Sequence, residues 1–315
     1  MRTTLVHNPT AGHHTPSRDD LLRMLRREGH DPSYCSSKDR EFAAALEDPG
    51  ELVIVAGGDG TVGKVACRLA GRGIPLAILP LGTANNFAQS LGIAGAAETL
   101  AASWKAAAPR PVDVGVARGP WGETVFLEGV GLGLFPRLLA AHERRAGEAE
   151  EPGTDAAKLR QGLRLWAEQL AGGAPLEVGI TLDGEDLSGR YVLAEALNVG
   201  LVGPNLPLAP DADPGDGRLD LVLVGGNDGE LARHLDDRLH DRRTCRPPEL
   251  TVRRGSRLRL EWTGTRLRLD DELWPPAGRE VPSGAWAELE VRAGALAVLA
   301  PAADDRAGLT GVRPG

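Results

Sequence analysis

The chain has 315 residues, a formal net charge of −8 and three cysteines. This length allows two domains with separate cores, and the acidic balance argues against nucleic acid as the partner. Cys35, Cys67 and Cys245 are far apart and odd in number, which excludes a disulfide framework and a zinc spacing and indicates a reducing cytosol. No apolar run reaches the roughly 18–20 residues of a membrane span, and we expect no signal peptide.

The first third of the chain alternates apolar runs with helical spacing, which predicts an α/β domain with an open parallel sheet. Leu52 to Ala56 is the clearest strand, because it is apolar, rich in β-branched residues and bounded by turn residues. We expect strands at 3–7, 33–36, 52–56 and 76–79, and helices at 16–29, 39–46, 62–70, 84–91 and 96–107.

Glycine-bearing turns follow three of these strands. They are Asn-Pro-Thr-Ala-Gly at 8–12, Gly-Gly-Asp-Gly-Thr at 57–61 and Pro-Leu-Gly-Thr-Ala-Asn-Asn at 80–86. Glycine lets backbone N–H groups approach a phosphate, and a helix N-terminus favours negative charge. Ligands of open α/β sheets bind at the carboxyl ends of the strands. The turns therefore predict one phosphate site, and the alternative is ordinary strand-to-helix turns with capping threonines.

From Val112 onward the sequence pattern changes to short segments of alternating apolar and polar residues, separated by turn residues. This pattern predicts an antiparallel β-rich sandwich, interrupted by helices at 136–145 and 156–170. We expect strands at 112–117, 123–128, 176–182, 191–199, 219–224, 250–252, 258–262, 266–269 and 287–291. The predicted domains are 1–111 and 112–301, with a mobile loop at 147–153 and a disordered tail at 302–315.

The three turns are followed late in the chain by Ala-Pro-Asp-Ala at 209–212 and Asp-Gly-Arg-Leu-Asp at 216–220. Together, in this order, these motifs resemble the diacylglycerol kinase catalytic-domain family, the bacterial lipid kinases related to sphingosine kinases. The resemblance covers about residues 3–301. Gly-Gly-Asp-Gly-Thr alone is shared with NAD kinases, whereas the Gly-Thr-x-Asn turn and the late segment are more specific. The resemblance implies an N-terminal nucleotide domain, a β-rich C-terminal domain and an active cleft between them.

The resemblance also implies an ATP site and Mg²⁺. The residues that would hold ATP are Asn8, Pro9, Thr10, Ala11, Gly12, Ser36, Gly57, Gly58, Asp59, Gly60, Thr61 and Thr83. The site has no Walker lysine, so backbone amides, hydroxyls and Mg²⁺ must bear the phosphate charge. Asp59 and Asp113 would hold the catalytic Mg²⁺ through water, which suits an ion that keeps several waters. Asp216, with the backbone carbonyls of Asp213 and Arg218, would bind a structural Mg²⁺, and the alternative there is a plain Asp-Gly hairpin turn.

Glu272 is the expected catalytic base, acting with Asp59. It matches the glutamate of the family's Asp-Gly-Glu motif, here Asp270-Asp271-Glu272. A lipid hydroxyl that attacks a γ-phosphate needs a carboxylate to orient it and accept its proton. The alternative is that three acids after a strand form a solvated turn.

Several positions depart from the family's pattern, including Gly203-Pro204-Asn205 where three glycines are usual. Gly63 and Lys64 replace an asparagine and a glutamate, Asn86 stands where aspartate is common, and Asp271 replaces a glycine. An amide binds a metal-bound water less strongly than a carboxylate, so Asn86 weakens the expected Mg²⁺ network. We expect an active ATP- and Mg²⁺-dependent kinase of diacylglycerol or a related lipid alcohol. The alternatives are an NAD kinase and a nucleotide- and lipid-binding pseudo-kinase.

The segment Arg233–Arg259 carries nine arginines and four acidic residues. It predicts either a solvated face or contact with anionic lipid at the inner membrane face, where each basic residue contributes roughly 1 kcal/mol. Trp274, two residues from Glu272, is a candidate for lining an acyl cleft. We therefore expect a cytoplasmic enzyme with peripheral membrane contact. The sequence names neither the lipid nor the oligomeric state.

Overall fold

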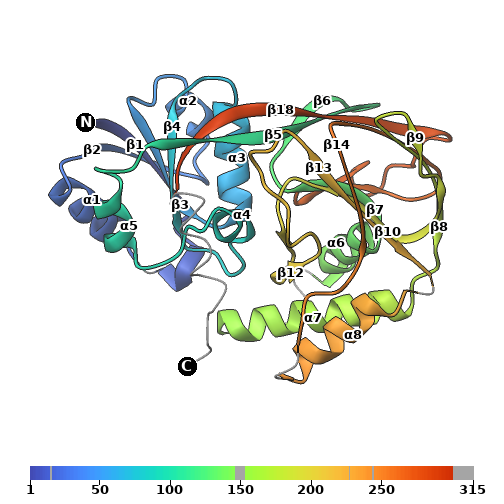
Figure 1. The fold of residues 1–315 in the computed structure, drawn as a ribbon. Coiled ribbons are helices and arrows are strands. Elements are labelled where there is room, and N and C mark those ends of the chain that lie inside the picture. The colour runs from blue at the N-terminus through green and yellow to red at the C-terminus, as the bar shows by residue number, and fades with distance from the viewer. Residues whose placement is uncertain (15, 146–152, 227, 243–244, 301–315) are drawn as a thin grey trace. The chain divides into compact units, whose positions relative to one another are not determined.

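A computed structural model describes residues 1–14, 16–145, 153–226, 228–242 and 245–300. The chain divides into two compact units (Figure 1). Unit 1 comprises residues 1–113 together with the chain from residue 293, and unit 2 comprises residues 114–292. The predicted loop at 147–153, apart from Gly153, and the predicted tail at 302–315 lie outside the described residues.

Unit 1 is built on a parallel sheet. Its strands are β1 (Arg2–His7), β2 (Asp31–Ser36), β3 (Leu52–Gly57), β4 (Pro75–Pro80) and the end of β18 (Ala285–Leu299). The order is β2-β1-β3-β4-β18, and every neighbouring pair is parallel. The helices are η1 (Ala11–His14), α1 (Arg18–Arg27), α2 (Phe42–Ala45), α3 (Asp59–Leu69), α4 (Asn86–Ser90) and α5 (Ala97–Ser103).

Two local features of the sequence account for the central strand β3 and for the start of helix α1. All six residues of β3 are buried, as expected for a parallel strand covered on both faces. The Ser17 hydroxyl accepts the N–H of Asp20, and the Asp20 carboxylate accepts the N–H of Ser17. This reciprocal pair satisfies two N–H groups that the helix leaves open at its start.

Unit 2 is built on antiparallel strand pairs. A continuous path of hydrogen-bonded strands runs β17-β16-β7-β10-β8-β15-β18, while β13 and β14 branch from β10. Its strands are β5 (Pro109–Gly119, entering from unit 1), β6 (Gly122–Phe126), β7 (Gly129–Gly133), β8 (Leu176–Leu182), β9 (Glu185–Asp186), β10 (Gly189–Leu197), β11 (Leu201–Val202), β12 (Leu206–Pro207), β13 (Leu219–Gly225), β14 (Thr251–Gly255), β15 (Arg257–Trp262), β16 (Leu267–Leu269) and β17 (Glu272–Trp274). Helices α6 (Leu134–Arg145), α7 (Asp155–Ala171) and α8 (Glu230–Leu239) complete it.

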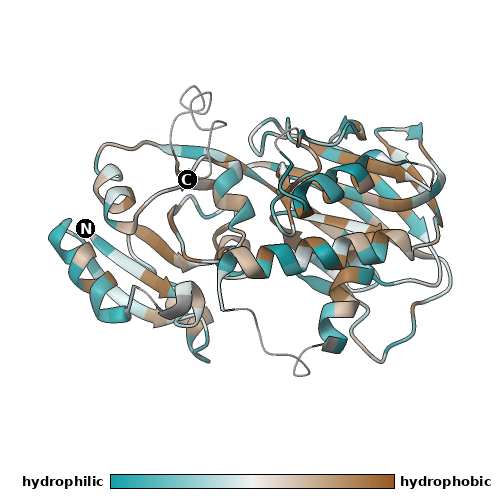
Figure 2. Cartoon of the chain, turned by 90° about the horizontal axis from the view of Figure 1, so that it is seen from below, coloured by the Kyte–Doolittle hydropathy of each residue, from teal (hydrophilic) through white to brown (hydrophobic). Residues whose placement is uncertain are grey.

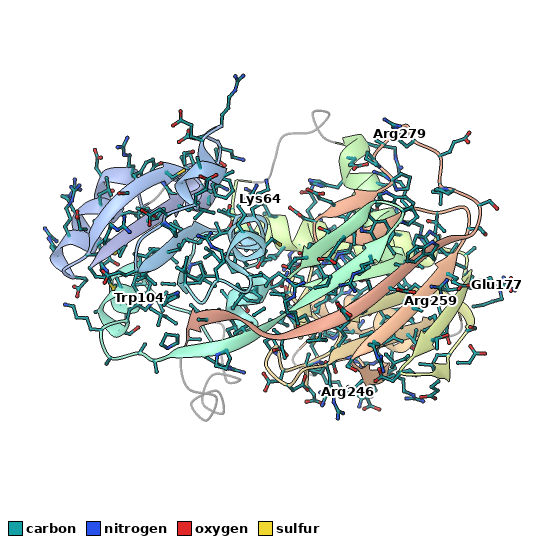
Figure 3. The ribbon with its side chains drawn as sticks, turned by 90° about the horizontal axis from the view of Figure 1, so that it is seen from above. Lys64, Trp104, Glu177, Arg246, Arg259 and Arg279 are labelled. Carbon is teal, nitrogen blue, oxygen red and sulfur yellow. The ribbon has the colours of Figure 1, made fainter. Side chains whose placement is uncertain are left out.

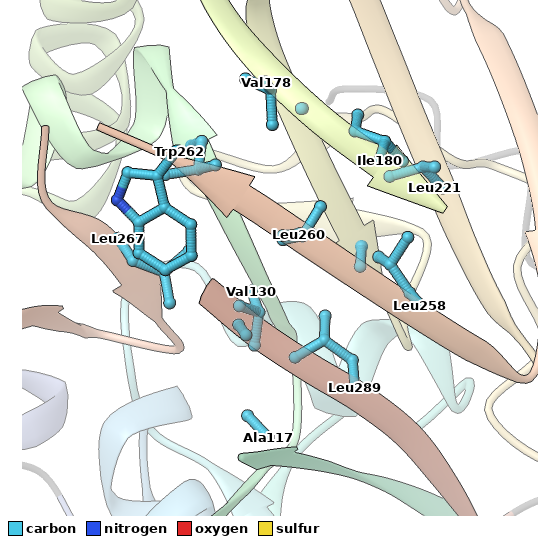
Figure 4. Packing of buried hydrophobic residues seen from close by; sticks show 14 of the residues in the cluster. Ala117, Val130, Val178, Ile180, Leu221, Leu258, Leu260, Trp262, Leu267 and Leu289 are labelled. Carbon is cyan, nitrogen blue, oxygen red and sulfur yellow. The ribbon is translucent and has the colours of Figure 1, made fainter. Parts of the chain in front are cut away.

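The core of unit 2 is formed by side chains from one face of these strands. Figure 4 shows Val130 of β7, Ile180 of β8, Leu260 of β15 and Leu289 of β18 packed in one cluster. Hydrophobic colour is concentrated on the strands, whereas the helices carry both hydrophilic and hydrophobic stretches (Figure 2). The alternation of buried and exposed residues along β15 shows why this sequence folds as a strand with one face toward the core.

The expected fold class is confirmed, with an α/β N-terminal part and a β-rich C-terminal part. Several elements were not predicted: helix α8, the short helix η1, the short strands β9, β11, β12 and β17, and β7, whose Gly-Val-Gly-Leu-Gly sequence has a low strand propensity. The second domain was expected to extend to residue 301. The structure instead assigns the chain from residue 293 to unit 1, because Ala297 and Val298 pair in parallel with Pro75 and Leu76 of β4. None of the helices in the described part of the chain has the length and apolar character of a membrane span.

We predict that Ser17→Ala lowers the free energy of unfolding by about 1 kcal/mol, because it removes the N-cap of α1. Urea unfolding followed by circular dichroism measures this change. Ser37→Ala is the control, since that serine follows β2 and caps no helix. Equal stability of the Ser17 variant and the wild type would contradict the capping role.

Candidate functional site

The three glycine-bearing turns of unit 1 lie side by side at the carboxyl edge of the parallel sheet. Each is tied to a neighbouring strand by backbone hydrogen bonds. The N–H of Asn8 donates to the carbonyl of Ala56 at 2.9 Å, and the N–H of Leu81 donates to the carbonyl of Gly57 at 3.0 Å. The turns after β1, β3 and β4 therefore form one continuous backbone surface.

Close approach explains the glycines in these turns. A methyl group on Gly82 would lie 2.4 Å from the Cα atom of Gly58, far inside van der Waals contact. A methyl group on Gly57 would lie 2.8 Å from the Thr61 side chain. Gly12 has a φ of +61°, in the left-handed region that glycine adopts without steric cost, and faces the Leu81 carbonyl. A side chain at position 82 would therefore push the second and third turns apart, a side chain at position 57 would clash with Thr61 of the same turn, and glycine at position 12 is favoured by its positive φ.

Asn85 holds the third turn in shape. Its Oδ1 accepts the N–H of Gly82 at 2.9 Å, and its Nδ2 donates to the carbonyl of Gly82 at 2.6 Å. Its φ is +51°, a left-handed conformation that asparagine tolerates better than most residues. Sequence reasoning did not assign Asn85 a role, although an asparagine directly before an apolar helix is a signal for this conformation.

Asp59 connects two helix N-termini. It is the first residue of α3, and its Oδ1 accepts the N–H of Phe87, at 3.1 Å, in the first turn of α4. Burial raises the pKa of the Asp59 carboxyl, while the N–H groups of Phe87 and its neighbours oppose that rise. Asn86 begins α4 and is buried, with 3% of its surface exposed. The structure thus places Asp59 at the three turns, where the sequence predicted it.

Other predicted residues of the ATP site have local partners. The Asn8 Oδ1 accepts the hydroxyl and the N–H of Thr10, which closes the first turn. The Ser36 hydroxyl lies at the end of β2 and accepts the N–H of Lys38 at 3.1 Å. These bonds shape the turns and leave their roles toward ATP as predictions.

Gly63 and Lys64 are the two residues of α3 that depart from the family's pattern, and their surroundings differ. Lys64 is exposed on α3 (Figure 3). Gly63 has open space around the position where a side chain would begin, with no atom within 4 Å. A Cβ atom at position 63 therefore displaces no neighbour.

The predicted carboxylates for catalytic Mg²⁺ are both in unit 1. Asp113 is 2% exposed, and its Oδ1 accepts the N–H of Gly294 at 2.7 Å. Among the described residues, no group of three or more histidines, cysteines, aspartates or glutamates has a spacing that could hold a metal. Mg²⁺ bound through water needs only one or two carboxylates beside the phosphates of its substrate, and Asp59 at the turns fits that requirement.

The predicted structural Mg²⁺ loop is closed by its own hydrogen bonds. The carbonyl of Asp213 accepts the N–H of Asp216 at 3.2 Å, and the Asp216 carboxylate accepts the N–H of Arg218 at 2.9 Å. Gly217 has a φ of +75°. These features are those of the Asp-Gly turn that the sequence left as the alternative. The metal role of Asp213, Asp216 and Arg218 stays a prediction.

In unit 2, Glu272 begins β17 and is exposed, opposite Leu269 of β16. Asp270 and Asp271 form the turn between the two strands. The left-handed residue of this turn is Asp270, with a φ of +51°, and Asp271 is not among the residues with positive φ. The replacement of glycine by Asp271 therefore causes no backbone strain.

The Asp270 carboxylate anchors this turn. Its Oδ2 accepts the N–H of Leu127 at 2.8 Å, and its Oδ1 accepts the N–H groups of Glu128 and Gly129 at 2.8 and 3.0 Å. Burial raises the pKa of the Asp270 carboxyl, and the three N–H donors oppose the rise. Three donors on one carboxylate make a rigid attachment of the turn to residues 127–129.

A buried ion cluster lies beside the turn. The Arg268 guanidinium, 1% exposed, donates to the Glu195 and Glu128 carboxylates, each at 3.1 Å. Burial raises the pKa of Glu195 to about 7, although Arg268 opposes the rise. Sequence reasoning missed this cluster. The available signal was a charged residue between apolar neighbours in two predicted strands, Leu-Arg-Leu and Leu-Ala-Glu-Ala-Leu.

The arginines of the 233–259 segment are widely paired with acids. Arg233 contacts Glu230 and Asp237, Arg242 contacts Asp236 and Asp237, and Arg259 contacts Glu261 and Glu288. Arg246 and Arg259 are labelled in Figure 3.

Trp274 packs against Trp121 and Trp262, with ring centroids at 4.9 and 6.3 Å, beside the unit 2 core.

Comparisons with known proteins identify both parts of the chain. Residues 2–117 match the diacylglycerol kinase catalytic domain, and residues 155–300 match the YegS C-terminal NAD kinase beta sandwich-like domain. A diacylglycerol kinase of Mycobacterium tuberculosis is 25% identical over 89% of this chain and 91% of its own length. A diacylglycerol kinase of Bacillus subtilis is 29% identical over 71% of this chain and 73% of its own length.

Two solved structures share the fold. A diacylglycerol kinase from Bacillus anthracis has a TM-score of 0.65 at 21% identity, over 96% of this chain and 97% of its own. An NAD kinase from Archaeoglobus fulgidus, in complex with ATP, has a TM-score of 0.55 at 13% identity, over 99% of this chain and 98% of its own.

We predict that Gly82→Ala lowers the free energy of unfolding by about 1–3 kcal/mol, because the added methyl group forces the two turns apart. Gly63→Ala is the matched control. It adds the same group in open space inside α3, so it should stabilise the protein by about 0.5–1 kcal/mol. Thermal unfolding of the two variants measures the contrast, and equal destabilisation would contradict the close approach at Gly82.

The buried Glu195 carboxyl predicts that the stability of the protein depends on pH. Because its pKa is raised to about 7 in the fold, the folded state binds an extra proton between its ordinary pKa and pH 7. The stability of the wild type should therefore fall as the pH rises from 5 to 8, by up to about 3 kcal/mol relative to Glu195→Gln. Urea unfolding of both proteins at each pH gives the difference. Parallel curves would show that Glu195 does not titrate in this range.

Proposed function

Because the chain belongs to the diacylglycerol kinase catalytic-domain family, we propose that it is an ATP-dependent lipid kinase. The reaction transfers the γ-phosphate of ATP to the hydroxyl of diacylglycerol or a related lipid alcohol. The observation that carries the proposal is the convergence of three glycine-bearing turns at the carboxyl edge of a parallel sheet, where the backbones of Gly58 and Gly82 come into close contact.

The phosphates of ATP are held by backbone and hydroxyl groups of unit 1. The N-terminus of α3 follows Gly58 directly and favours negative charge. Thr61, Thr83 and the Asn8–Gly12 turn add hydroxyl and amide donors around it. Lys64 lies in the second turn of α3 and is exposed.

Mg²⁺ is part of the proposal. Asp59 is the residue that would hold it, through water, with Asp113 as the second predicted carboxylate. When bound with ATP, Mg²⁺ neutralises charge on the phosphoryl group that is transferred. The contact between the Asp59 carboxylate and the N–H of Phe87 fixes the orientation of this side chain before any ligand binds.

Glu272 acts as the base. The lipid oxygen forms a bond to the γ-phosphorus, the bond between that phosphorus and the β,γ-bridging oxygen breaks, and ADP leaves. The proton of the lipid hydroxyl passes to the Glu272 carboxylate. This role suits an exposed carboxylate on an anchored turn, because a base must reach its substrate while holding its orientation.

NAD kinase activity is the second candidate function. The Gly-Gly-Asp-Gly-Thr turn is shared with NAD kinases, and the fold is similar to that of an NAD kinase from Archaeoglobus fulgidus. That likeness is one of fold alone. The lipid assignment is favoured by the catalytic-domain match over residues 2–117 and by the curated relatives from Mycobacterium tuberculosis and Bacillus subtilis. A pseudo-kinase would bind ATP without transferring phosphate.

Membrane contact follows from a substrate that stays in a bilayer. The 233–259 segment still has more arginines than acids, although several of its arginines are engaged in ion pairs. We propose peripheral contact through this segment, weakened by each internal ion pair.

We predict that Glu272→Gln lowers phosphate transfer to diacylglycerol at least 100-fold, because the amide cannot accept the proton. The dissociation constant for ATP should stay unchanged, since the predicted ATP residues belong to unit 1. Transfer is measured with γ-labelled ATP and dioleoylglycerol in mixed micelles, and binding by calorimetry. Glu261→Gln, an exposed carboxylate of unit 2, is the control. Full turnover by the Glu272 variant would refute the assignment of the base.

A further inference from the structure

Neighbouring strands of unit 2 bring buried charges together beside the Asp270 turn. Arg268 of β16 pairs with Gly131 of β7, and Gly131 in turn pairs with Glu195 of β10. The three residues therefore form one row across three strands. Side chains in such a row point to the same face of the sheet.

The glycine in the middle of this row makes room for the ion pair. A methyl group on Gly131 would lie 2.2 Å from the Cδ atom of Glu195. Because Gly131 has no side chain, the Glu195 carboxylate and the Arg268 guanidinium meet across β7, with Nη1 and Oε2 3.1 Å apart. Glycine thus gives β7 a low strand propensity and at position 131 leaves the space that the ion pair fills.

Each nitrogen of the Arg268 guanidinium has a different partner. Nη1 donates to Glu195, Nη2 donates to Glu128, and Nε donates to the backbone carbonyl of Asp270 at 2.6 Å. The guanidinium carbon also lies 3.8 Å from the centre of the Phe135 ring. A planar fork with fixed donors is required to reach three acceptors at once, and only arginine provides it.

The third of these contacts reaches the turn that carries Glu272. The backbone carbonyl of Asp270 accepts a hydrogen bond from Arg268, and the backbone N–H of Asp270 donates to the carbonyl of Gly129 at 2.9 Å. The side-chain carboxylate of Asp270 accepts the N–H groups of residues 127–129. Glu272 follows two residues later. Asp270 is therefore fixed through its backbone and its side chain.

Burying the charged groups of Glu195 and Arg268 costs free energy. Glu195 is 0% exposed and its Oε1 has no hydrogen-bond partner in the structure, while Arg268 is 1% exposed. Removing such charges from water costs free energy that a single ion pair often fails to return, so a buried ion pair is weak support for a role in stability alone. The partners of Arg268 instead point to a role in fixing the turn.

We propose that Arg268 and Glu195 are positioning residues, which fix the Asp270–Asp271 turn and so hold the Glu272 carboxylate in one orientation toward the lipid hydroxyl. Glu195 acts through Arg268, and Arg268 acts through the carbonyl of Asp270. This inference rests on the proposed function for its catalytic part. The fixing of the turn itself does not depend on it.

Hydrogen exchange tests the structural half of the inference in the full chain. Arg268→Lys keeps the charge but replaces the fork by one nitrogen. The amides of residues 127–129 and of Asp270 should then exchange at least tenfold faster, while those of β15 keep the wild-type rate. Arg259→Lys, an exposed arginine of β15, is the matched control (Figure 3). Unchanged exchange at residues 127–129 and 270 in the Arg268 variant would overturn the inference.

Kinetics test the catalytic half, with Glu195→Gln as a second variant that keeps the shape of the side chain. Both variants should lower kcat for transfer from γ-labelled ATP to dioleoylglycerol at least tenfold, with the KM for ATP unchanged. A fall in kcat that is matched by loss of folded protein in thermal unfolding counts against a positioning role, and so does an unchanged kcat. A wild type that phosphorylates no lipid contradicts the proposed function, whereas the exchange rates still decide whether Arg268 holds the turn.

Discussion

The contact between the backbones of Gly58 and Gly82 is the constraint on which the candidate nucleotide site depends. A parallel sheet places the carboxyl ends of β1, β3 and β4 at one edge, but three adjacent turns with ordinary side chains would stand apart. With no Cβ atom on either side, the second and third turns touch, and Gly12 brings the first turn to Leu81. The result is a continuous backbone surface beside the N-terminus of α3, at a site that has no Walker lysine.

The two units fix their candidate catalytic carboxylates in different ways. Asp59 is itself held, by the N–H of Phe87 at the start of α4. Glu272 is exposed, and the residue that is held is Asp270, two positions earlier. An acid that binds a metal-bound water benefits from a fixed and partly buried oxygen, whereas a base must be accessible to the incoming lipid hydroxyl. The different supports match the different roles that we propose for these residues.

Local patterns were enough to predict the strand β3 and the glycine-bearing turn after it, whereas Asp59 and Glu272 were chosen as site residues from the resemblance to the lipid kinase family. The signals were strong because each involved a short stretch, such as a β-branched run followed by glycines. The element β7 was missed because its glycines serve a contact with Glu195, which local propensity does not show. The Arg268–Glu195 pair joins residues 73 positions apart, and the parallel pairing of β18 with β4 joins residues still farther apart. Such contacts depend on register, which one sequence does not reveal. Asp271 raised a concern over backbone strain that the structure removes, because Asp270 carries the positive φ.

The central claim is that the phosphate acceptor is a lipid alcohol. The most direct measurement gives the wild-type protein γ-labelled ATP together with a total lipid extract and NAD⁺ in one reaction. After extraction with chloroform, the account predicts that the label appears in the organic phase, in a phosphorylated lipid that mass spectrometry identifies. Label that appears in NADP⁺ in the aqueous phase, with none in the lipid, would contradict it.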